Sequence, residues 1–157
     1  MTIELDKKVP DFSAPSTNAE DGEFRLSAHR GHIVVVYFYP KDNTPGCTTE
    51  GQDFAAQHAK FTRAGAIVVG VSRDSLKSHQ NFKAKMKFPF DLLSDPDEKL
   101  CRQFGVIKEK KMYGKTVLGI ERSTFVIDGN GKLAAEWRGV KVPGHVADVL
   151  ASVQALK

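Results

Sequence analysis

The run IVVVYFY at residues 33–39 limits the possible folds of this chain more than any other segment. A strand with one face in water alternates polar and apolar residues, whereas this run has no charged position. It therefore predicts a strand buried on both faces, in the middle of a sheet. Pro40 follows directly and ends the strand, because proline has no amide hydrogen for the sheet ladder.

Helical and strand patterns alternate along the rest of the chain. Apolar spacing and capping residues predict helices at 45–63, from the Ser75 cap to the residue before Pro89, from Pro96 to Gly105, and at 145–156. Further strands are expected at 23–26, 67–71, 90–93, 122–128 and 133–137, with a hairpin turn at 128–131 and a loop with an edge strand at 106–121. This order predicts an α/β fold in one domain, 1–157, with a mixed central β-sheet flanked by helices on both faces, and it suits a thioredoxin-like fold.

Composition excludes several classes of protein. The chain has 157 residues, 41% hydrophobic and 27% charged, and only two cysteines, so it is not a small disulfide-stapled domain. Its net charge of +4 comes from scattered lysines, and the one cluster, at 108–111, is interpreted as a solvated turn or loop; no nucleic-acid partner is expected. No stretch approaches the ~18 apolar residues of a membrane span, and the N-terminus has no signal pattern. We expect a cytoplasmic protein with no membrane partner.

The first turn of the helix at 45–63 carries a cysteine. With Thr44 as N-cap, Pro45 and Gly46 occupy the first two helical positions and Cys47 the third. Free backbone N–H groups and the helix dipole favour the thiolate, which is the nucleophilic form. The Thr44 hydroxyl could bond the amide of Cys47 or a substrate oxygen, and Gly46 would allow a small ligand to approach the backbone. The alternative, an unreactive buried cysteine, remains open at this point.

The motif Pro40-x-x-x-Thr44-x-x-Cys47 resembles the signature of the peroxiredoxins. The sequence around it, YFYPKDNTPGCT, is similar to the bacterioferritin-comigratory-protein branch, also called peroxiredoxin Q. Four further segments match in the family's order, at 10–12, 70–74, 103–106 and 121–128. The resemblance extends from about residue 5 to the C-terminus.

The resemblance implies a thiol peroxidase for hydrogen peroxide and organic hydroperoxides, with a role in antioxidant defence and no cofactor or metal. Cys47 would be the peroxidatic cysteine and would become a sulfenic acid. Thr44 and Arg122 would bind and polarise the peroxide, Arg122 would also hold the thiolate, and Pro40 would shield the sulfur from water. Backbone amides near Gly46 would supply further donors.

Strand alternation places Arg122 on the same face as Thr124 and Val126. Fixed donors such as a guanidinium lower the barrier of a reaction in which negative charge develops on a leaving oxygen. Glu50 lies one helical turn after Cys47. It either orients Arg122 or is a solvated helix charge, and the sequence does not distinguish the two.

The chain departs from the family pattern in its second cysteine. Gln52 stands where many members of the branch carry the resolving cysteine, and the segment 78–86, where others carry it, has none. Cys101 lies in a helical pattern beside Leu100 and Phe104, which favours a buried small residue. We therefore expect a one-cysteine mechanism with an external thiol: glutathione, a glutaredoxin or a thioredoxin-type protein. The rival hypothesis is resolution by Cys101, within or between chains.

Other functions have weaker support. A thioredoxin-like redox sensor or interaction module without turnover is the non-enzymatic alternative. A zinc site at His29 and His32 lacks a matching ligand pair nearby. We expect all the histidines to lie at the surface or at helix caps, namely His29, His32, His58, His79 and His145. A monomer is expected, and a dimer that packs around the Cys47 loop stays an alternative.

Overall fold

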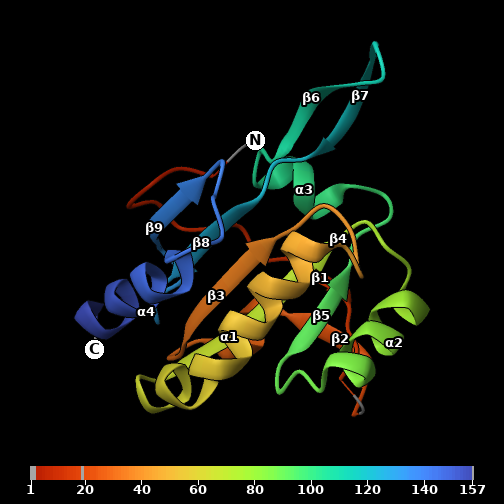
Figure 1. Ribbon diagram of the computed structural model, residues 1–157. Coiled ribbons are helices and arrows are strands. Elements are labelled where there is room, and N and C mark those ends of the chain that lie inside the picture. Colours follow the sequence, from red (N-terminus) through yellow and green to blue (C-terminus); the bar gives the residue numbers. More distant parts are fainter. Residues whose placement is uncertain (1–2, 19, 157) are drawn as a thin grey trace.

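The run at 33–39 forms the middle strand of a five-stranded sheet. The computed structural model describes residues 3–18 and 20–156 (Figure 1). The sheet has the order β5-β4-β3-β8-β9, in which every residue of β3 (Ile33–Phe38) is buried. Strands β4 (Ala66–Ser72) and β5 (Asp91–Ser94) run parallel to β3. Strand β8 (Ser123–Ile127) runs antiparallel to β3 and pairs with β9 (Leu133–Arg138). The predicted mixed sheet is confirmed.

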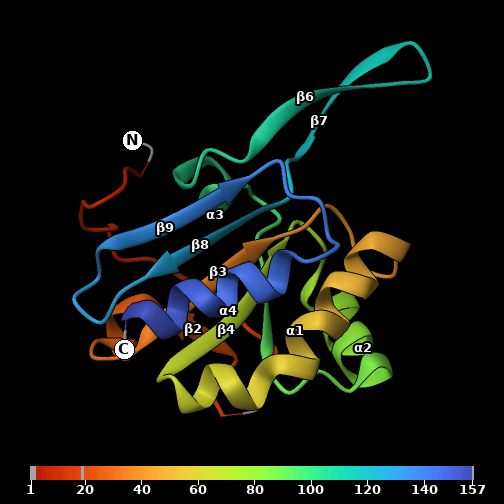
Figure 2. The same cartoon turned by 60° about the vertical axis from the view of Figure 1, so that its left-hand side comes forward.

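Three helices cover one face of this sheet. The long helix α1 (Pro45–Arg63) and the C-terminal helix α4 (His145–Leu156) pack side by side across it (Figure 2). Their apolar residues form one core with α2 (Leu76–Met86) and with Val35 and Tyr37 of β3. Consecutive strand residues point to opposite faces, so alternate residues of β3 belong to this core and the others to a second one.

The second core lies on the opposite face. It contains Val36 and Phe38 of β3 together with the short helix α3 (Lys99–Gln103). The N-terminal region completes it through Phe12 and Phe24, and that region comprises β1 (Ser13–Pro15), β2 (Glu23–Arg25) and the 3-10 helix η1 (Leu26–His29). The expectation of helices on both faces is thus confirmed.

The prediction for the third helix was partly wrong. The helix begins at Lys99 rather than at Pro96, and Glu98 before it has a left-handed backbone with φ of 63°. The Asp95 carboxylate accepts hydrogen bonds from the backbone amides of Leu100 and Cys101, at 3.2 and 2.8 Å. Residues 95–98 therefore form a turn that caps the helix from outside.

The interpretation of residues 106–121 was also wrong. They form a separate two-stranded hairpin, β6 (Ile107–Met112) and β7 (Lys115–Ile120), which projects from the body of the molecule (Figure 2). Tyr113 and Gly114 at its tip both have positive φ, 53° and 78°, as a type I′ turn requires. The lysine cluster thus lies within a strand.

Smaller differences concern the ends of elements. β8 begins at Ser123, so Arg122 stands just ahead of the strand in which it was expected. The strand predicted at 67–71 is longer by one residue at each end, and the strand predicted at 133–137 is longer by one residue at its C-terminal end. Within the described residues, no helix is both long and apolar enough to cross a membrane.

Candidate active site

Cys47 occupies the first turn of α1, directly behind the loop that leaves β3. Thr44 is the N-cap, with φ of −86° and ψ of 152°, and Pro45 opens the helix as expected. The thiol is only 2% exposed. The Thr44 hydroxyl makes no capping bond and instead donates to the Lys41 carbonyl at 2.8 Å. Its oxygen lone pairs therefore stay available to accept a hydrogen bond.

Arg122 joins the sulfur to a buried carboxylate. Its Nη2 donates to Cys47 Sγ at 3.3 Å, and its Nη1 donates to Glu50 Oε1 at 2.7 Å. Glu50 is fully buried, so its interpretation as a solvated helix charge is wrong. Its contact with Nη1 puts it in a position to orient Arg122. One guanidinium thus spans two residues on the same face of α1, one turn apart.

Gly46 leaves the space that this guanidinium fills. A Cβ atom at position 46 would lie 3.1 Å from Arg122 Nη2, closer than side chains ordinarily pack. The sequence assigned Gly46 to close approach by a ligand, and the structure shows close approach by Arg122. The helix start, the glycine and the arginine therefore form one unit.

Burial makes the charge of Glu50 expensive. Desolvation raises its pKa from 4.5 to about 7, against the opposing effects of the charge and the hydrogen bond of Arg122. Among the described residues, none donates a hydrogen bond to its Oε2. Glu50 therefore relies on a single partner, Arg122, which in turn faces the sulfur.

A groove opens beside the first turn of α1. It has a volume of about 500 Å³. Its lining residues come from α1 and from the segment before α4, namely Pro45, Gly46, Thr49, Asp53, Val142 and Pro143. Apolar groups form most of this lining, so the groove suits an alkyl group. Pro40, expected to shield the sulfur, lies half-buried at the start of the loop before α1; its shielding role stays a prediction.

Cys101 lies in the other core, beyond the sheet from Cys47. It is fully buried with Leu100 and Phe104, which confirms the prediction of a buried small residue. Burial, and next the Asp95 carboxylate, raise the pKa of its thiol far above the ordinary range. Burial and the Asp95 carboxylate therefore keep Cys101 in its unreactive thiol form.

The expectation for the histidines was wrong for two of them. His79 and His145 are buried, at 0% and 5% exposure. His145 Nε2 lies 2.7 Å from the Thr124 hydroxyl, and burial lowers the pKa of His145 to about 4. A signal for His79 was present in the sequence, because it precedes Phe82 by three positions and so shares the inward face of α2.

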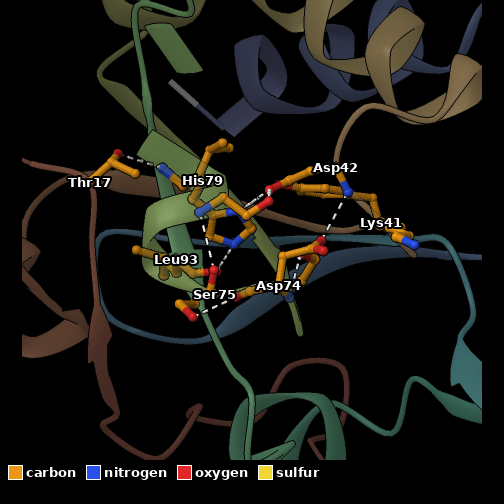
Figure 3. A network of polar contacts seen from close by, with 12 residues as sticks. Thr17, Lys41, Asp42, Asp74, Ser75, His79 and Leu93 are labelled. Carbon is orange, nitrogen blue, oxygen red and sulfur yellow. Dashed lines mark hydrogen bonds and ion pairs between the residues drawn. The ribbon is translucent and has the colours of Figure 1, made fainter. Parts of the chain in front are cut away.

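Asp42, Asp74 and His79 form the one cluster in the described part of the chain with the spacing of a metal site. Their ligand atoms lie within 4.8 Å of one another. The Asp42 carboxylate accepts hydrogen bonds from Tyr39 and Ser78, at 2.6 and 2.7 Å (Figure 3). A cation would have to displace these protons, so the donor set favours a hydrogen-bond network over a metal.

Comparisons with known proteins agree on one family. The model of the AhpC/TSA family matches residues 5–136. Peroxiredoxin Bcp of Xanthomonas campestris is 56% identical over 151 residues, covering 96% of this chain and 94% of the relative. Peroxiredoxin Bcp of Bacillus subtilis is 48% identical over 154 residues, covering 98% and 97%. A solved structure of Xanthomonas campestris peroxiredoxin Q has 55% identity and a TM-score of 0.88, covering 98% of this chain and 96% of that one.

Proposed function

The chain belongs to the AhpC/TSA family, and we propose that it reduces hydrogen peroxide and organic hydroperoxides by a one-cysteine mechanism at Cys47. One observation carries the assignment of the site. The Arg122 guanidinium donates to Cys47 Sγ at 3.3 Å at the start of a helix, so a positive charge and free amides surround one buried sulfur. Such a surrounding stabilises a thiolate, the form that attacks peroxides.

The first half-reaction oxidises the sulfur by two electrons. The Cys47 thiolate attacks the terminal oxygen of the hydroperoxide, an S–O bond forms, and the O–O bond breaks. The sulfur becomes a sulfenic acid, and the other oxygen leaves with the electron pair and takes a proton from solvent to become an alcohol or water. Arg122 and the amides of the first turn face the charge that develops on this oxygen, and Thr44 binds the peroxide.

The second half-reaction uses an external thiol. That thiol attacks the sulfenic sulfur to give a mixed disulfide and water. A second external thiol then attacks the mixed disulfide, which forms a disulfide between the two external thiols and releases reduced Cys47. Cys101 is buried on the other side of the sheet, with its thiol pKa strongly raised, which supports an outside reductant. Thioredoxin, a glutaredoxin and glutathione are the candidate reductants. The protein is proposed to act in the cytoplasm, because a reducing compartment would keep Cys47 and Cys101 as free thiols. It is proposed to act there as a monomer.

The groove beside Pro45 supports organic hydroperoxides as substrates. It borders the residues before Cys47 and is lined mainly by apolar groups. The structure of a relative, the bacterioferritin comigratory protein of Xanthomonas campestris, is described in terms of alkyl peroxide reduction, in an intermediate and ligand complex. An alkyl chain in the groove would lie beside the first turn of α1, the turn that carries Cys47.

Turnover with defined thiols tests this proposal. We expect the wild-type protein and Cys101→Ser to consume cumene hydroperoxide with glutathione or thioredoxin as the only reductant, and Cys47→Ser to be inactive. Loss of turnover in Cys101→Ser, with retained folding, would make Cys101 the resolving residue. A wild-type protein that is oxidised once but never turns over with any of these thiols would instead be a redox sensor.

A further inference from the structure

A buried polar network fastens the loop that precedes the Cys47 helix. Residues 39–44 connect β3 to α1, and Asp42 in this loop is 5% exposed. Its carboxylate points toward α2, where it meets the fully buried His79 (Figure 3). The proposed peroxidase mechanism assigns no role to either residue.

Both carboxylate oxygens of Asp42 have hydrogen-bond partners. Oδ1 accepts from the Tyr39 hydroxyl at 2.6 Å, while Oδ2 accepts from the Ser78 hydroxyl at 2.7 Å and pairs with His79 Nδ1 at 2.8 Å. The backbone amide of Asp42 donates to Asp74 Oδ2 at 2.9 Å. The loop is thereby fastened to its own first residue, Tyr39, and attached to the segment after β4 and to α2.

The partners of His79 define its protons. Nε2 lies 2.9 Å from the Leu93 carbonyl, which can only accept, so Nε2 carries a hydrogen. The Tyr39 and Ser78 hydroxyls donate to the two oxygens of the Asp42 carboxylate, so this group acts as an acceptor on both sides. The hydrogen of its contact with His79 therefore lies on Nδ1. With both nitrogens protonated, His79 is an imidazolium cation.

We propose that the Asp42–His79 ion pair is a latch that holds the start of the Cys47 helix closed, with His79 as a positioning residue for the peroxide reaction. The inference rests on the proposed function of Cys47. The latch joins α2 to the loop whose last residue, Thr44, occupies the N-cap position of α1. Its closure keeps Thr44 and the first turn of α1 in register with Arg122.

The two half-reactions place opposite demands on this latch. Peroxide reduction needs the closed site, in which the sulfur is 2% exposed and Arg122 lies 3.3 Å from it. An external thiol needs access to that same sulfur, so the loop must open after oxidation. Loss of the latch should therefore slow the first step and accelerate the second.

Rapid measurements of each half-reaction test the latch. In His79→Phe we expect the rate of Cys47 oxidation by hydrogen peroxide to fall roughly tenfold or more, since small misplacements of reacting groups are costly. The rate at which dithiothreitol reduces the sulfenic acid should rise several-fold. His58→Phe is the matched control, because His58 is a half-buried histidine of α1 outside this network, and we expect both rates to stay within twofold. Parallel decreases of both rates in His79→Phe would indicate general destabilisation and overturn the proposal.

A conservative variant separates hydrogen bonding from charge. In Asp42→Asn the amide can donate to a neutral His79 while Nε2 still donates to Leu93, so the loop should stay closed and peroxide oxidation should remain within about threefold of wild type. Asp42→Ala removes these bonds and should behave like His79→Phe. Equal rates for the two Asp42 variants would contradict positioning by this pair.

Nitrogen-15 NMR of the histidine ring tests the pair without any turnover. We expect both ring nitrogens of His79 to be protonated at neutral pH in the folded wild-type protein, and one of them to be bare in Asp42→Asn. A neutral His79 ring in the wild type would overturn the latch. Because this readout is independent of Cys47 chemistry, it separates failure of the latch from failure of the proposed function, which the Cys47→Ser control tests.

Discussion

The two cysteines lie in opposite cores of one sheet, and the comparison shows how neighbours determine reactivity. Cys47 stands at a helix start, where Arg122 donates to its sulfur. Cys101 lies in a short helix beside the Asp95 carboxylate, and burial with this negative charge raises the pKa of its thiol. Both side chains are almost inaccessible, so exposure does not distinguish them. The positive charge that faces the Cys47 sulfur does, because it offsets the cost of burying a thiolate, whereas burial and Asp95 both oppose a thiolate at Cys101.

Removal of the positive charge of Arg122 should have the largest effect on peroxidase activity. We expect Arg122→Met to lower kcat/KM for hydrogen peroxide by roughly 10²–10³-fold, the loss typical when a donor to a developing oxyanion is removed. Steady-state rates with glutathione in excess check this. Arg25→Met, which changes an exposed arginine of β2, is the control and should retain wild-type activity. If Arg122→Met stayed within threefold of wild type, Arg122 would not distinguish the two cysteines.

Glu50 should make the stability of the Cys47 side depend on pH. Its pKa is about 7 in the folded protein and near 4.5 in the unfolded chain, so between these values the folded state holds more protons. The free energy of unfolding of the wild type should therefore fall as pH rises from 4.5 through 7, by up to roughly 3 kcal/mol. Glu50→Gln should lack this component of the fall.

Urea denaturation of both proteins at pH 5 and pH 8 measures the difference. Glu136→Gln, a change at a half-buried carboxylate of β9, serves as the control and should follow the wild-type pH dependence. Parallel pH profiles for wild type and Glu50→Gln would show that Glu50 does not titrate with a raised pKa.

A larger residue at position 46 should lower the activity, because it would crowd Arg122. In Gly46→Ala the new Cβ would stand 3.1 Å from Arg122 Nη2, so the guanidinium that donates to the sulfur must shift from its position. We expect kcat/KM to fall about tenfold, a loss near 1.4 kcal/mol. Alanine is the better helix former, so the melting temperature should not fall. A variant with full activity would show that the guanidinium tolerates this shift.

The smallest effect is expected on the Cys101 side. Asp95→Asn replaces one of the two oxygens that accept from the amides of Leu100 and Cys101 with a nitrogen that cannot accept, and the loss of that bond should cost about 1 kcal/mol of stability. Alkylation of Cys101 by iodoacetamide should stay slow in the folded variant, because burial of the thiol persists. Fast alkylation of Cys101 in folded Asp95→Asn would show that the charge of Asp95 alone protects it.

The sequence predicts the features that follow from local patterns. The run at 33–39 is a buried central strand, and Thr44 and Pro45 start α1 where capping preferences place them. The pairing of Glu50 with Arg122 needed the fold, because it joins residues 72 positions apart. The resemblance to a family located Arg122, but helical spacing alone could not decide between a solvated and a buried Glu50.

The features that the sequence missed depend on tertiary contacts. His79 was assigned to the surface because a polar side chain usually lies there, yet Asp42 and the Leu93 carbonyl satisfy both of its nitrogens in the core. Pro96 is a favoured first residue of a helix, but Asp95 binds the amides of Leu100 and Cys101 and so starts the helix later. The hairpin of β6 and β7 carries exposed lysines on an isolated ribbon, where no core pattern marks a strand.

Peptide-level mass spectrometry tests the central difference between the two cysteines most directly. The reduced wild-type protein is treated with one equivalent of hydrogen peroxide in the presence of dimedone, which traps sulfenic acids. We predict a dimedone adduct on Cys47 and an unmodified Cys101 thiol in the same molecules. A dimedone adduct on Cys101, or a disulfide between Cys47 and Cys101, would contradict the account.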